Sequence, residues 1–141
     1  MVDKFKLYFS KIDNEEKSNV SINMAIACVF LIIIMSTVSS IYYGYYYDSH
    51  SGLSRVFNEG VFSVHSIIYL ILLFIVFPSG ALFFYKRMFY PSVVYTISYF
   101  SFVVGWIDLF SSYFIFYYFP IGCVFIKGCA GIMFCREKQQ M

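Results

Sequence analysis

Charged side chains are scarce in this sequence. Lys, Arg, Asp and Glu together make up 13% of the 141 residues, whereas hydrophobic residues make up 60%. Soluble domains are about a quarter charged and about half apolar, so a water-soluble fold of this length could not hide the apolar surface that this chain carries. The net charge is only +2, and the basic residues are dispersed. The composition therefore gives no indication of a nucleic-acid partner.

Catalytic and metal-binding motifs are also missing. The sequence has no G-x-S-x-G elbow, no H-E-x-x-H pair and no paired acidic motif, and its only histidines are His50 and His65. The four cysteines form no C-x-x-C pair and have no histidine nearby in sequence: Cys28, Cys123, Cys129 and Cys135. We expect them to be small buried hydrophobes, with acylation or reactivity of Cys135 beside Arg136 as the alternative. The prediction is a non-enzymatic protein without a metal or a cofactor.

Long apolar runs are what the sequence does contain. They cover four stretches, at about residues 22–43, 61–85, 91–110 and 113–134. Each is close to the length, about 20 residues, that a helix needs to cross a bilayer, and the runs do not alternate like barrel strands. We therefore predict an all-α integral membrane protein, a four-helix bundle that forms a single membrane domain over residues 1–141. A single helix over residues 91–134 would be about 66 Å long, far more than the hydrocarbon thickness, so a tight hairpin is expected at residues 108–112.

The first 20 residues have a different pattern. Apolar residues recur there at helical spacing, with lysines on the flanks: Val2, Phe5, Tyr8, Phe9 and Ile12. This pattern predicts a short amphipathic helix that lies in the membrane surface, within a cytoplasmic segment over residues 1–20. Residues 13–19 are expected to form a solvated connector, with Ser18 or Ser21 as the N-cap of the first span.

Proline interrupts two of the predicted spans. Pro78 and Pro120 each remove a backbone donor, so a kink is predicted near both positions. Pro91 instead suits the first turn of the third span.

The lysines and arginines indicate an orientation. Most of them stand at one set of segment ends: Lys4, Lys6, Lys11, Lys17, Lys86, Arg87, Lys127, Arg136 and Lys138. The long loop at residues 48–60 has only Arg55, and the hairpin at residues 108–112 has no basic residue. The positive-inside rule then predicts a multi-pass protein of the bacterial inner (plasma) membrane with both termini in the cytoplasm.

Three ionisable residues are expected at membrane depth: His65, Asp108 and Lys127. Ionisable groups there are costly and often functional. His65 and Asp108 are expected near the outer surface, where they could pair and relay protons or bind a cation; alternatively each is hydrated at the interface. Lys127 is expected to extend to the cytoplasmic headgroups, or else to act as a counter-ion or substrate ligand.

Small residues line one face of the third and of the fourth span. They are Ser98, Ser101 and Gly105, leading to Asp108, in the third span, and Gly128, Ala130 and Gly131 in the fourth. Small side chains let helix backbones approach closely, so these faces are predicted to pack inside the bundle or against a second copy of the chain.

Residues 83–108 carry a resemblance to a known family. Two phenylalanines at 83 and 84, the basic pair Lys86 and Arg87, and Pro91 precede an aliphatic and aromatic span that reaches Asp108. This arrangement resembles a family of small four-span bacterial inner-membrane proteins of unknown function, and the resemblance implies topology only. In composition the chain is also similar to immunity proteins against pore-forming colicins and to plasmid or phage exclusion proteins.

The predicted function is contact between helices within the bilayer, as in immunity or exclusion against a membrane-active toxin or incoming element. The expected partners are the lipid bilayer and either another membrane protein or a second copy of the chain. The alternative is a small transporter or channel subunit whose polar route includes His65, Asp108 and Lys127.

Overall fold

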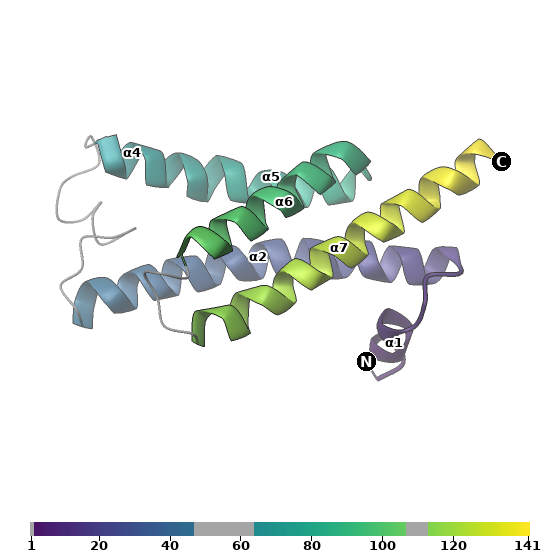
Figure 1. Ribbon diagram of the computed structural model, residues 1–141, viewed down its shortest axis with the longest axis horizontal. Helices are drawn as coiled ribbons and strands as arrows, with labels where there is room; N and C mark the ends of the chain where they lie inside the picture. The colour runs from purple at the N-terminus through teal and green to yellow at the C-terminus, as the bar shows by residue number, and fades with distance from the viewer. Residues whose placement is uncertain (1, 47–63, 107–112) are drawn as a thin grey trace. The chain divides into compact units, whose positions relative to one another are not determined.

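The computed structural model of the chain describes residues 2–46, 64–106 and 113–141, and all secondary structure in these ranges is helical (Figure 1). In chain order the elements are α1 (Val2–Phe9), α2 (Glu15–Tyr46), α4 (Val64–Ile71), the π-helix η1 (Leu72–Val76), α5 (Phe77–Tyr85), α6 (Phe89–Trp106) and α7 (Tyr113–Gln140). The predicted all-α class is thereby confirmed for the described residues. By length and composition, two helical stretches among them could cross a membrane, Glu15–Val38 and Tyr117–Gln140. Two shorter apolar helices cover Leu72–Tyr85 and Phe89–Val104.

The chain forms two compact units. The terminal unit comprises residues 1–28 and 80–141, and so contains α1, the start of α2, the end of α5, α6 and α7. The central unit comprises residues 29–79, with the rest of α2, α4 and η1. The side chains of the candidate site described below all belong to the terminal unit.

An irregular turn precedes Pro78 in the central unit. Proline cannot donate to the helical ladder, and its ring clashes with the turn before it. Here that turn is widened into η1, in which the Phe77 N–H donates to the Leu72 carbonyl five residues back, the pattern of a π-helix. The structure thus places a π-helical turn where the sequence predicted a kink. At Pro120, by contrast, α7 continues as one helix.

Helix α2 begins earlier than predicted. The Lys17 N–H donates to Asn14 Oδ1 at 2.9 Å, which makes Asn14 the N-cap. Lys17 Nζ also lies 2.8 Å from the Asp13 carboxylate, and this hydrogen bond lowers the pKa of Asp13. The expectation of an N-cap at Ser18 or Ser21 is therefore wrong: both are buried one or two turns inside the helix.

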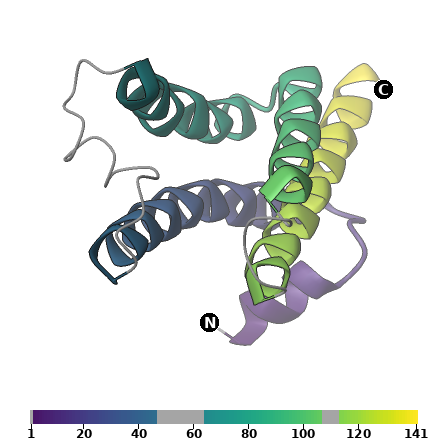
Figure 2. The ribbon, with the colours of Figure 1, turned by 60° about the vertical axis from the view of Figure 1, so that its left-hand side comes forward.

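A cluster of aromatic rings forms the centre of the terminal unit. The ring of Phe125, fully buried on α7, lies 5.7 Å from that of Phe84 and 5.5 and 5.2 Å from those of Tyr95 and Tyr99. Both tyrosine contacts are edge-to-face, a favoured geometry for aromatic pairs. The Tyr99 hydroxyl donates to the Tyr118 carbonyl at 2.8 Å, so its polar tip is satisfied. Helices α6 and α7 run side by side around this cluster (Figure 2).

Helix α7 crosses the start of α2 at two buried glycines. A Cβ atom at Gly128 would lie 2.7 Å from the Cβ of Ala25 and 3.0 Å from the Phe84 ring, closer than carbon atoms approach. A Cβ at Gly131 would lie 3.0 Å from the Ser18 carbonyl oxygen. Because neither glycine has a side chain, the two helices pack nearly backbone to backbone. These two positions of the predicted small-residue face of the fourth span are therefore at a helix contact.

The face of α6 that packs inside the terminal unit differs from the predicted one. It consists of the buried residues Ser92, Tyr95, Thr96, Tyr99 and Val103. Ser98 and Ser101 are exposed on the other side, and the surroundings of Gly105 lie outside what the structure describes. The aromatic face is inside because its rings bury more apolar surface, and Gly80 leaves the space that the Tyr95 ring fills.

Replacement of Gly128 by leucine is expected to destabilise the protein by about 1–3 kcal/mol, because the new side chain must displace Ala25 and Phe84. Thermal unfolding in mild detergent, followed by the helical circular dichroism signal, measures this loss. Ser101→Leu, on the exposed face of α6, is the matched control and is expected to unfold like the wild type. Equal losses in the two variants would contradict the assignment of the packed faces.

Candidate functional site: the Lys127 anchor and the α1–α7 groove

Helix α1 is too short to be stable alone. It has eight residues, whereas isolated helices shorter than about 12 residues are marginal in water. The last carbonyls of a helix have no intrahelical donor. The Ser10 N–H donates to the Lys6 carbonyl at 3.3 Å and the Ser10 hydroxyl to the Leu7 carbonyl at 2.7 Å. The carbonyls of Tyr8 and Ser10 are bound from elsewhere in the chain.

Lys127 of α7 supplies these hydrogen bonds. Its ammonium donates to the Tyr8 carbonyl and, at 3.2 Å, to the Ser10 carbonyl. It also lies 4.5 Å from the centroid of the Tyr8 ring, within the range of a cation–π contact. A cation at a helix C-terminus is stabilised by the helix dipole as well as by the carbonyl lone pairs. Lys127 therefore caps α1 and anchors it to α7.

Tyr8 is the side chain through which α1 packs against the terminal unit. It is 8% exposed, and burial raises the pKa of its hydroxyl. The other α1 residues of the predicted apolar face remain outside, since Val2, Phe5 and Phe9 are 70%, 58% and 71% exposed. The predicted apolar face is thus divided: Tyr8 packs against the protein, whereas Val2, Phe5 and Phe9 point outward.

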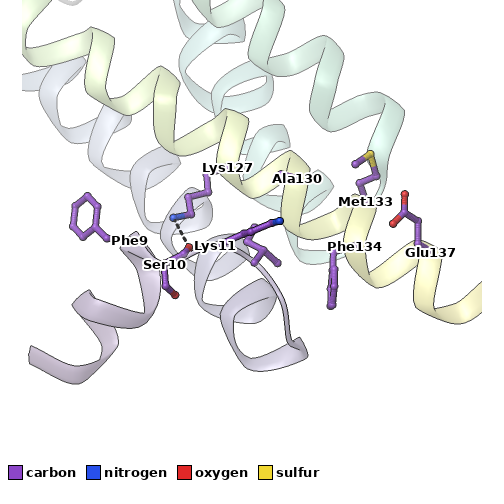
Figure 3. Close-up of a pocket in the computed structure, with 9 residues that line it drawn as sticks. Phe9, Ser10, Lys11, Lys127, Ala130, Met133, Phe134 and Glu137 are labelled. Atoms are coloured by element: carbon purple, nitrogen blue, oxygen red, sulfur yellow. Dashed lines mark hydrogen bonds between the residues drawn. The ribbon is translucent and has the colours of Figure 1, made fainter.

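A groove lies between the end of α1 and α7, with a volume of about 470 Å³ (Figure 3). We call it the α1–α7 groove. Its lining comes from the last residue of α1, from the connector after it and from one side of α7: Phe9, Ser10, Lys11, Ile12, Lys127, Ala130, Met133, Phe134 and Glu137. The groove therefore combines two lysines and one carboxylate with apolar walls.

Arg87 forms a second cationic contact in the same unit. It follows α5 and has a backbone φ of 54°, in the left-handed region that usually selects glycine. The Arg87 N–H donates to Phe84 and the Met88 N–H to Phe83, at 3.1 and 3.0 Å, which is the Schellman pattern of a helix end. An arginine in this conformation carries strain, which surrounding contacts have to offset.

The side chain of Arg87 provides such contacts. One guanidinium nitrogen donates to Asn19 Oδ1 at 2.7 Å, and the other lies 3.6 Å from Cys135 Sγ. The same thiol lies 3.0 Å from the Ser18 hydroxyl, which donates to the Gly131 carbonyl at 2.7 Å. This network ties the turn between α5 and α6 to α2 and α7.

The predicted polar residues are not brought together in the described part of the chain. His65 lies in the first turn of α4, but its side chain is outside the described residues, and so is Asp108. A pairing of the two stays a prediction. Lys127 binds the backbone at the end of α1, a partner that its sequence position did not indicate.

Sequence reasoning missed Arg87 and Tyr8 as members of the site. The sequence indicates only a topological role for Arg87, because its residue type does not favour the left-handed conformation that ends α5. Tyr8 was grouped with its apolar neighbours, and nothing in their spacing distinguishes it from Phe5 or Phe9.

Replacement of Lys127 by methionine keeps the length of the side chain and removes its donors. We expect α1 to be released at a cost of about 1–3 kcal/mol, the usual value of hydrogen bonds to a charged group. Hydrogen exchange of residues 2–9 measures this directly and should become much faster. Lys138→Met on the same helix, where the ammonium lies over the Phe134 ring, is the control; unchanged exchange in Lys127→Met would show that α1 is held by other contacts.

The chain matches no protein-family model, no curated protein and no solved structure. What it does is therefore inferred from the contacts of its own residues.

Proposed function

We propose that this chain is a multi-pass protein of the bacterial inner membrane, with both termini in the cytoplasm and four spans packed as a helical bundle. The proposal is supported by the two helices that are long and apolar enough to cross a bilayer. It also rests on the lysines and arginines at residues 4–17, 86–87 and 136–138, which the positive-inside rule assigns to one side. The amphipathic helix α1 would then lie at the cytoplasmic surface.

The distribution of polar and apolar side chains supports the same placement. Large apolar side chains are exposed along the helices: Phe30, Leu31, Ile34, Val38, Val94, Ile97, Val104, Phe119, Ile126 and Met133. The buried hydroxyls of Ser18, Ser21 and Thr96 donate to backbone carbonyls at 2.7–2.9 Å, with Ser92 the exception among the described residues. Apolar surface outside and satisfied hydroxyls inside is the arrangement that lipid requires.

We further propose that the protein acts through helix contacts within the bilayer, as in immunity or exclusion against a membrane-active toxin or element. The observation that carries this is the exposed face of α6, where Ser98 and Ser101 lie between Val94, Ile97 and Val104. Small residues on an apolar helix face permit close approach of another helix. The engagement of Lys127 with α1 favours anchoring over a place in a transport route.

The membrane placement predicts where reporters will be found. Fusions after Lys86 and after the C-terminus should both report the cytoplasm, whereas a fusion within residues 48–60 should report the opposite side, because the basic residues lie in the former segments. Paired phosphatase and fluorescent-protein fusions measure this. Lys86 and the C-terminus on opposite sides of the membrane would exclude the arrangement.

Immunity or exclusion predicts a phenotype. Cells that lack the gene should become sensitive to at least one pore-forming toxin, or accept an incoming element, that cells with the gene resist. Ser101→Leu should lose this protection while still accumulating in the membrane, since it fills the small-residue face of α6 without touching the packed one. Phe119→Leu, an exposed apolar exchange on α7, is the matched control. Sensitivity that does not change across a panel of toxins and conjugating donors would remove the proposal.

A further inference from the structure

Two lysines bring positive charge to the α1–α7 groove. Lys127 and Lys11 both line it, and Figure 3 shows the Lys11 side chain extending toward α7 between Lys127 and Phe134. The Lys127 ammonium binds the Tyr8 and Ser10 carbonyls and lies over the Tyr8 ring. Lys11 lies on the exposed connector. The Lys11 ammonium is therefore the group that can bind a phosphate in the groove, and Lys127 adds a second positive charge to the lining.

Glu137 also lines the groove and carries the opposite charge. It follows Lys127 by ten residues on α7, which is about 15 Å along a helix. Its carboxylate disfavours an occupant that carries further negative groups at the far end. The groove therefore suits a ligand with a single phosphate.

The apolar walls distinguish a lipid from free phosphate. Phe9 and Met133 are 71% and 46% exposed, and Ile12 and Phe134 also line the groove. Inorganic phosphate would leave these side chains in water, whereas acyl chains would cover them. A volume of about 470 Å³ is within the range of pockets that hold small molecules or headgroups.

We propose that the α1–α7 groove binds an anionic phospholipid, with the phosphate at Lys11 and the acyl chains against Phe9 and Met133. The proposal rests on the membrane placement proposed above, because the groove adjoins the predicted cytoplasmic end of the fourth span. It assigns α1 a role beyond surface contact: together with α7, the end of α1 forms a lipid site.

The test uses the full chain, purified in mild detergent with equal amounts of phosphatidylglycerol and phosphatidylcholine of the same acyl length. Native mass spectrometry counts the lipid that stays bound. The wild type should retain phosphatidylglycerol in preference, and Lys11→Gln should lower its retention about fivefold, the value of one basic residue at an anionic lipid surface. Lys4→Gln is the matched control, since Lys4 is exposed on α1 and does not line the groove. Lys127 is left unchanged because it holds α1.

Three results would overturn the lipid site. Equal retention of the two lipids would remove the headgroup preference, and equal losses in Lys4→Gln and Lys11→Gln would show general attraction to an anionic surface. Displacement of the lipid by millimolar inorganic phosphate would identify free phosphate as the occupant. Extraction of membranes with alkaline carbonate distinguishes this failure from that of the proposed function. If the chain resists extraction but shows no lipid preference, only the lipid site is wrong. If the chain is extracted, both the lipid site and the membrane placement are wrong.

Discussion

Gly128 has no side chain at the point where α7 crosses α2. The two helices can therefore approach closely enough for the other contacts between them to form. Ala25 lies against the bare backbone, so Ser18, two turns earlier on α2, reaches the Gly131 carbonyl and the Cys135 thiol. Where lipid surrounds a helix pair, as proposed above for this chain, close backbone packing contributes more to helix association than bulky side chains do. A small residue at this crossing is therefore the condition under which the polar network can form.

Lys127 and Arg87 both bind uncharged acceptors. Lys127 donates to backbone carbonyls, and Arg87 donates to the Asn19 amide oxygen and lies near the thiol of Cys135. In an ion pair in low-dielectric surroundings, the attraction has to offset the desolvation of two charged groups. In each of these contacts only one charged group is desolvated. Carbonyls at a helix end already carry partial negative charge. The Asp13–Lys17 ion pair, by contrast, stands at the start of α2, where the Asp13 carboxylate is exposed.

The helices of the described residues could be predicted because hydrophobic length is a local property of the chain. Helix starts, packed faces and binding partners depend on contacts between distant residues, and there the predictions were incomplete. Asn14 caps α2 instead of either buried serine, and Tyr95, not the small residues, faces inward on α6. Lys127 is unusual because it lies deep in an apolar run, but its partner cannot be predicted because it lies at the other end of the sequence. The left-handed backbone of Arg87 has no signature in residue type.

The anchoring of α1 has a consequence for assembly. Lys127 lies 119 residues after Tyr8, and a ribosome synthesises the chain from the N-terminus. Until Lys127 has been synthesised, the carbonyls at the end of α1 therefore lack the ammonium that caps them in the folded protein. Helix α1 is synthesised first, but it can dock on Lys127 only after α7 has been synthesised and has packed. Docking of the N-terminal helix therefore requires that the C-terminal helix is already in place.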